Sequence, residues 1–110
     1  MTEKEAMIRY GIPPDIIKEY KTVRKYDKSG DVLSDGIGQT DIERISLMVT
    51  LHDVGFSENE ILRYMQFTIA GDDGKRLEML ESKRSGALNE LHLKQDQLDK
   101  LDYLRFKIKK

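Results

Sequence analysis

The chain has no cysteine and no tryptophan, and Pro13 and Pro14 are its only prolines. Without cysteine it can form no disulfide and no thiolate metal site, and it has no thiol for redox sensing or nucleophilic catalysis. Secreted domains of this size usually depend on disulfides, so we expect a cytoplasmic protein. The sequence shows no export signal and no apolar run near the roughly 20 residues of a membrane span, so we expect no membrane partner.

The overall composition favours helices. Charged residues make up 35% of the 110 residues and apolar residues 38%, a balance typical of long exposed or self-associating helices. A chain this short buries only a modest core of its own, so we expect burial against a partner to matter. The net charge of −1 provides no overall attraction to nucleic acid, which leaves any DNA binding to a local patch. We predict a mainly all-α fold.

Three segments carry the pattern Ser/Thr-x-x-Glu, in which a hydroxyl and a carboxylate satisfy each other's free backbone N–H groups at a helix start. They are Thr2/Glu5, Thr40/Glu43 and Ser57/Glu60. Each predicts a helix N-terminus. At the third, Phe56 and Ile61 are spaced to pack as a hydrophobic staple.

These starts, with breaks at Gly11 and Gly55, divide residues 1–70 into elements. We predict helices over about residues 3–9, from Pro14 onward, over 41–53 and over about 58–67. The second helix carries an amphipathic stripe that is expected to face the core, made of Ile16, Ile17, Tyr20 and Val23. Residues 26–39 are rich in Gly, Asp and Ser and predict a loop or a short β-ribbon. The order indicates a winged helix-turn-helix-like head.

Residues 71–110 predict one long helix after a short break. The segment from Gly71 to Gly74 indicates a linker, and residues 75–110 keep an unbroken helical pattern about 50 Å long. Seven of its ten heptad seam positions are apolar: Leu77, Leu80, Ala87, Leu91, Leu98, Leu101 and Ile108. We name these seven residues the seam and predict that they form a homodimer interface.

No group of residues indicates an enzyme, a metal site or a cofactor. His52 and His92 have no partner at a metal-ligand spacing. The segment that begins at Asp27 starts like a calcium loop, but Val32 stands where the turn needs glycine. The run that begins at Gly71 lacks the spacing of a phosphate-binding loop. We therefore expect no cofactor and no catalytic residue.

One basic stripe stands out on the second helix and its extension, and it comprises Lys18, Lys21, Arg24, Lys25 and Lys28. Lysines spaced i, i+3, i+7 and i+10 share one helix face and can lie along a phosphate backbone. The alternative interpretation is an ordinary solvated face. Asp15 and Glu19 sit beside the stripe, and residues 1–40 contain seven basic and seven acidic residues, so the segment is neutral overall.

The order of elements resembles that of the MerR family of bacterial transcription regulators. The similarity is clearest in Thr40-Asp-Ile-Glu-Arg-Ile and in Leu51-His-Asp-Val-Gly-Phe-Ser-Glu-Asn-Glu-Ile. The tail is also similar, in Arg76-Leu-Glu-Met-Leu-Glu-Ser-Lys-Arg and then Leu101-Asp-Tyr. It implies a homodimer with an antiparallel coiled coil that presents two heads to a palindromic promoter. It also implies double-stranded DNA as a partner, and RNA polymerase as a further one whose engagement changes when the DNA is distorted.

The head departs from the family pattern at the positions that usually contact DNA. Asp15 replaces a basic residue, Glu19 replaces an aromatic one, and the run from Gly36 to Gln39 lacks the arginine of the family's wing. Two functions therefore stay open. The first is a DNA-binding transcription regulator, and the second is a degenerate MerR-like protein-interaction module that has lost DNA binding.

Overall fold

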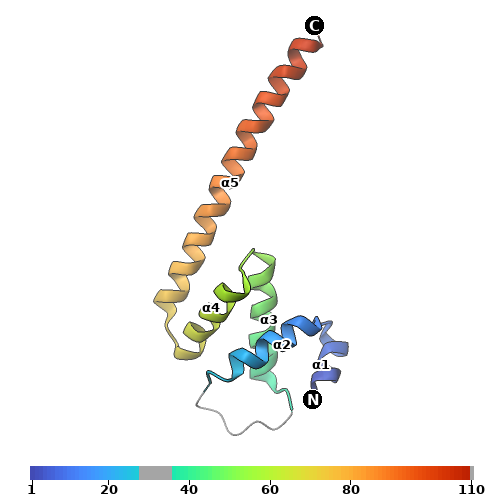
Figure 1. Cartoon of the computed structure of the whole chain (residues 1–110), viewed down its shortest axis with the longest axis vertical. Helices are drawn as coiled ribbons and strands as arrows, with labels where there is room; N and C mark the ends of the chain where they lie inside the picture. Colours follow the sequence, from blue (N-terminus) through green and yellow to red (C-terminus); the bar gives the residue numbers. More distant parts are fainter. Residues whose placement is uncertain (28–35, 110) are drawn as a thin grey trace. The chain divides into compact units, whose positions relative to one another are not determined.

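The computed structural model describes residues 1–27 and 36–109. Within these ranges it contains five helices and no strand: α1 (Glu3–Tyr10), α2 (Pro14–Arg24), α3 (Gln39–Asp53), α4 (Glu58–Ala70) and α5 (Asp73–Ile108) (Figure 1). The prediction of a mainly all-α fold is confirmed. Lys28 and most of the wing candidate, residues 26–39, lie outside the described residues. The chain divides into two compact units, Met1–Leu77 and Glu78–Lys110.

The first unit is built around α2, α3 and α4, which pack against one another (Figure 1). The predicted stripe of α2 is buried in full. It meets Ile45, Met48 and Leu51 of α3 and Ile61, Tyr64 and Met65 of α4, which are also buried. Ala6 of α1 and three residues outside the helices, Ile12, Ile37 and Phe56, complete this core. Each large apolar side chain buried here contributes about 1.5–3 kcal/mol, so the core stabilises the position of α2.

Two of the three predicted helix caps are confirmed. The Thr2 hydroxyl accepts a hydrogen bond from the Glu5 N–H at 3.2 Å. At α4 the bonds are reciprocal, because the Glu60 N–H donates to Ser57 Oγ at 3.2 Å and the Ser57 N–H donates to Glu60 Oε1 at 2.9 Å. These bonds satisfy backbone donors that the first turn of a helix leaves free.

The predicted cap at Thr40 is wrong. Helix α3 begins at Gln39 with Gly38 as its N-cap, and the Gly38 N–H donates to Asp41 Oδ2 at 2.8 Å. Asp41 therefore takes the position in the first turn that the prediction gave to Glu43. A carboxylate there also stabilises the positive end of the helix dipole.

Gly55 ends α3 in the left-handed conformation, as predicted. Its φ is 89°, its N–H donates to the His52 carbonyl, and the Phe56 N–H donates to the Leu51 carbonyl, both at 3.0 Å. This pair of bonds is a Schellman motif, which turns the chain and satisfies the last carbonyls of the helix. Phe56 and Ile61 are both buried, as a hydrophobic staple requires.

The break before α5 is shorter than predicted. Helix α4 continues to Ala70 rather than Phe67, and α5 begins at Asp73 because the Asp72 carboxylate accepts the Lys75 N–H at 3.1 Å. No residue of α5, all of which the structure describes, is buried. The large seam side chains are 39% to 85% exposed. Among the described helices none is long and apolar enough to cross a membrane.

The capping box of α4 gives the first prediction. Replacing Ser57 with alanine removes the acceptor for the Glu60 N–H and should lower the free energy of unfolding by about 0.5–2 kcal/mol. Urea denaturation followed by circular dichroism measures this change. Ser46→Ala, at an exposed position inside α3, is the control and should change stability by less than about 0.5 kcal/mol. Equal losses in both variants would show that the Ser57 cap does not stabilise α4.

Candidate nucleic-acid interface

The outward face of α2 carries three of the predicted DNA-binding residues. Burial of the core stripe against α3 and α4 leaves Lys18, Lys21 and Lys25 exposed on the opposite side of the helix. Lys18 and Lys25 form no ion pair with any residue in the described ranges. We name these three lysines the basic face.

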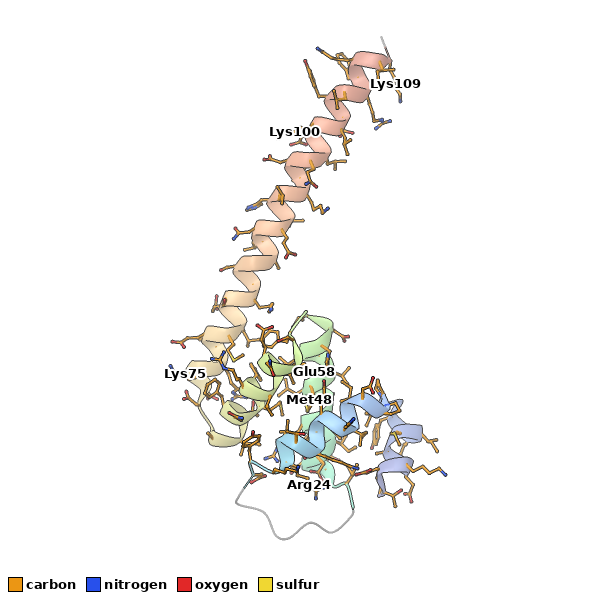
Figure 2. All side chains as sticks on the ribbon, in the orientation of Figure 1. Arg24, Met48, Glu58, Lys75, Lys100 and Lys109 are labelled. Carbon is orange, nitrogen blue, oxygen red and sulfur yellow. The ribbon has the colours of Figure 1, made fainter. Side chains whose placement is uncertain are left out.

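Two residues of the predicted stripe, Lys21 and Arg24, lie near carboxylates, and the two contacts differ in exposure. Lys21 Nζ lies 3.0 Å from Glu3 Oε1 of α1, and the two side chains are 58% and 40% exposed. Such an exposed ion pair contributes little to stability, so Lys21 can readily exchange Glu3 for another anion. Arg24, labelled in Figure 2, is only 25% exposed, and its Nε lies 3.9 Å from Asp41 Oδ1. The structure thus brings Arg24 to the start of α3 and not to the basic face.

Glu19 does not lie on the basic face. Its Oε2 is 2.7 Å from His52 Nε2 of α3, and its side chain is only 18% exposed. An imidazole Nε2–H that donates to this oxygen holds the carboxylate toward α3. Asp15 is then the acidic side chain that stays exposed beside Lys18 on the first turn of α2. Sequence reasoning considered His52 only as a metal ligand and missed this contact between residues 33 positions apart.

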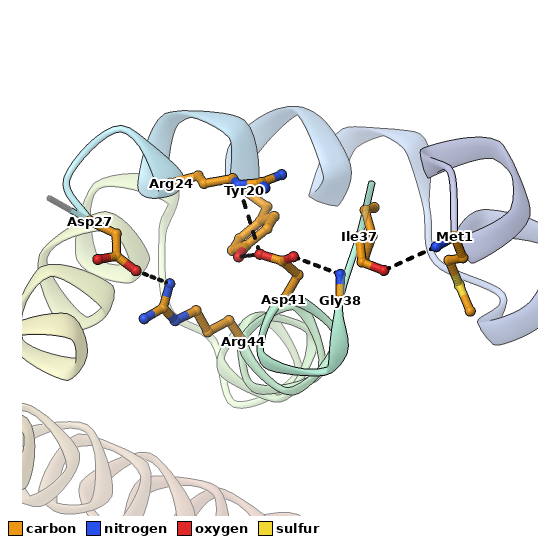
Figure 3. Close-up of polar contacts among 8 residues, drawn as sticks. All are labelled: Met1, Tyr20, Arg24, Asp27, Ile37, Gly38, Asp41 and Arg44. Atoms are coloured by element: carbon orange, nitrogen blue, oxygen red, sulfur yellow. Dashed lines mark hydrogen bonds and ion pairs between the residues drawn. The ribbon is translucent and has the colours of Figure 1, made fainter. Parts of the chain in front are cut away.

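A polar network connects α2 to the start of α3 (Figure 3). The buried Tyr20 donates its hydroxyl hydrogen bond to Asp41 Oδ1, while Asp41 Oδ2 accepts the Gly38 N–H. Arg44 Nη1 lies 2.8 Å from Asp27 Oδ2, and both side chains are less than one fifth exposed. The Asp41 carboxylate therefore caps α3 and also binds Tyr20 of α2. This connection fixes the side of α2 on which the basic face lies.

The N-terminus is joined to the same region. The Ile37 N–H donates to the Met1 carbonyl at 2.6 Å, and the Met1 amino group donates to the Ile37 carbonyl at 3.4 Å (Figure 3). The Ile37 side chain is buried. The described residues on both sides of the segment 28–35 are thus held by hydrogen bonds and by the core.

Burial and the bond to Asp41 change the acidity of Tyr20. Loss of water around the phenol, followed by the hydrogen bond and charge of Asp41, raises the pKa of Tyr20 from 10.0 to about 12. Nearby Arg44 opposes this shift in part. Since the phenol keeps its proton in neutral solution, it remains a hydrogen-bond donor to Asp41.

The chemistry that this surface offers is electrostatic. Three ammonium groups on one helix face can contact phosphates, and Asp15 can accept a hydrogen bond from a donor in a groove. Among the residues that the structure describes, no three His, Asp or Glu side chains gather as metal ligands.

The Tyr20–Asp41 bond gives a second prediction. Because the folded pKa is higher than the unfolded value, the folded state holds a proton that the unfolded state releases between pH 10 and about pH 12. Stability from this group is full below pH 10 and should fall as pH rises through this window. Tyr20→Phe should remove that part of the decline, measured as the difference between the two pH-dependent urea midpoints. If the urea midpoint falls equally with pH in the unmodified protein and in Tyr20→Phe, the prediction is wrong.

The chain was compared with protein families, curated proteins and solved structures. No family, no curated protein and no solved structure matches it. Its function is therefore argued from its own residues and geometry.

Proposed function

We propose that the protein is a MerR-like DNA-binding transcription regulator that acts as a homodimer on a palindromic promoter. The observation that carries this proposal is the basic face. Lys18, Lys21 and Lys25 are exposed on the outward side of α2 and its C-cap. Under this proposal α2 is the second helix of a helix-turn-helix, the helix that such proteins insert into the major groove. The withdrawal of Glu19 onto His52 supports the proposal, because it removes a carboxylate that would repel phosphate.

Asp15 and the N-terminal turn of α2 provide a means of base recognition. Residues at the start of a recognition helix contact base edges, and a carboxylate there can accept a hydrogen bond from the amino group of cytosine. The lysines further along α2 contact phosphates, which position the helix without reading sequence. Under this proposal Lys18, Lys21 and Lys25 bind the backbone and Asp15 discriminates among bases.

The seam supports a homodimer. Its apolar side chains lie exposed along a helix of 36 residues that buries none of its own residues. Burial of one leucine contributes about 1.5–3 kcal/mol, so pairing of two such helices is strongly favoured. The resemblance to MerR regulators favours an antiparallel pairing, which presents the two heads to the two halves of a palindrome.

The second candidate function is a protein-interaction module that has lost DNA binding. Two observations favour it: Asp15 is exposed beside the basic face, and Arg24 is turned toward Asp41. In that case RNA polymerase or another protein, and not DNA, would contact α2.

A third prediction tests the basic face. Lys18→Ala combined with Lys25→Ala should weaken binding to all duplex sequences and lower the slope of log affinity against log salt by about four, because the two heads of the homodimer lose two phosphate contacts each. Fluorescence anisotropy with labelled duplex DNA at several salt concentrations measures both quantities. The DNA should include the promoter of the protein's own transcription unit.

The control for this experiment is Lys100→Ala combined with Lys109→Ala, two exposed lysines of the second unit (Figure 2). This control removes the same net charge but should leave the salt slope unchanged. If the unmodified protein shows no association with DNA even at low salt, where electrostatic binding is strongest, the regulator proposal fails in favour of the interaction module.

A fourth prediction concerns the homodimer. Leu91→Asp with Leu98→Asp places two carboxylates in each seam and should abolish association, because a desolvated charge costs far more than a leucine contributes. Analytical ultracentrifugation should show a dimer for the unmodified protein and a monomer for the variant.

Ser82→Asp with Asn89→Asp is a matched control. It adds acidic groups at the same seven-residue spacing, but on the side of α5 opposite the seam, and should leave the dimer intact. A monomeric unmodified protein, or equal loss of the dimer in both variants, would contradict the seam as the interface.

A further inference from the structure

A cavity of about 130 Å³ opens between α2, α3 and α4 on the first unit. Its inner wall is apolar, formed by Val23, Met48 and Ile61, which are each at most 1% exposed, together with the half-buried Leu62. A buried apolar cavity of about 150 Å³ is large enough to bind benzene in other proteins. The cavity therefore has room for one compact apolar group, and its open side admits that group from solvent.

The polar lining of the same cavity comprises two acidic residues, Glu19 and Glu58, and two neutral ones, Thr22 and Asn59. Glu19 of α2 and Glu58 at the start of α4 both line it, and Glu58, labelled with Met48 in Figure 2, is exposed. Among the described residues that line it, none is lysine or arginine. His52 Nε2 lies 2.7 Å from Glu19 Oε2, and this contact holds the Glu19 side chain beside the cavity.

We propose that this cavity is a binding site for a small primary amine with a compact apolar body, such as an arylalkylamine. The apolar body would contact Met48, Val23 and Leu62, while the ammonium group would lie near the carboxylates of Glu19 and Glu58. Charge and shape act together in this arrangement, since few precisely placed polar groups in a mostly apolar pocket determine which ligand is accepted. The site does not depend on the proposed DNA-binding function.

Charge decides between an amine and other ligands of the same size. An anion would be repelled by two carboxylates, and a neutral molecule would gain no charge attraction from them. An ammonium group instead gains hydrogen bonds to charged acceptors, which are stronger than neutral ones. An apolar body with a positive charge at one end is thus the ligand chemistry that the lining fits.

The test uses the full chain, with benzylamine as the probe and benzyl alcohol as its neutral counterpart of the same shape. Titration followed by protein NMR should give saturable shifts of the methyl signals of Val23, Met48 and Leu62 with benzylamine. Glu58→Gln should weaken this binding about two- to five-fold, as expected for loss of a partly solvated charge pair. The Glu19→Gln and Glu58→Gln double variant should weaken it further.

Glu43→Gln is the matched control, because Glu43 is an exposed acid of α3 that does not line the cavity. It removes the same charge and should leave the affinity unchanged. Both Glu58 and Glu43 are exposed, so neither change disturbs the core, and circular dichroism can verify this. The proposal is overturned if benzylamine gives no saturable shifts, if benzyl alcohol binds as tightly, or if Glu58→Gln and Glu43→Gln weaken binding equally.

Discussion

The hydrogen bond from Tyr20 to Asp41 joins α2 to the start of α3, and the rest of the first unit depends on this connection. Asp41 lies in the first turn of α3, where its second oxygen accepts the Gly38 N–H and starts the helix. Tyr20 lies on the buried stripe of α2, and its side chain is only 2% exposed. A buried phenol without an acceptor would cost about 1–3 kcal/mol, so this bond favours the orientation of α2 that reaches Asp41. That orientation also directs Lys18 and Lys25 outward.

The same packing divides the charged residues of α2 between those that contact α3 and those that face outward. Glu19 and Arg24 lie on the flanks of the helix, within reach of α3, and each finds a partner there in His52 or Asp41. Lys18 and Lys25 lie opposite the core and meet no such partner among the described residues. On α2 and its C-cap the exposed charged residues are therefore three lysines, Lys18, Lys21 and Lys25, and one acid, Asp15. The DNA binding proposed above depends on this local excess of positive charge and not on the net charge of −1.

Sequence reasoning succeeded where the signal is local. The stripe of Ile16, Ile17, Tyr20 and Val23 follows from helical periodicity, and the Ser57 cap follows from a spacing of three residues. It failed at Thr40, because Ser/Thr-x-x-Glu is a common pattern. In the competing cap the Asp41 carboxylate, which accepts the Gly38 N–H, also accepts the Tyr20 hydroxyl, a tertiary bond that no local pattern shows. The contact between Glu19 and His52 was missed for the same reason. The cavity beside them depends on three helices and has no signature in the sequence.

The two units differ in what stabilises them. The first has a core to which all four of its shorter helices or their connections contribute, so its fold is explained within one chain. Along residues 78–108, helix α5 has local contacts such as the Gln95 amide bonded to Asp99 at 2.9 Å and Lys107 placed 5.1 Å from the centre of the Tyr103 ring. Contacts of this kind contribute only about 0.2–0.5 kcal/mol each, whereas most helical stability in proteins comes from packing of an apolar face. The exposed leucines of the seam are therefore the surface on which the homodimer proposed above depends.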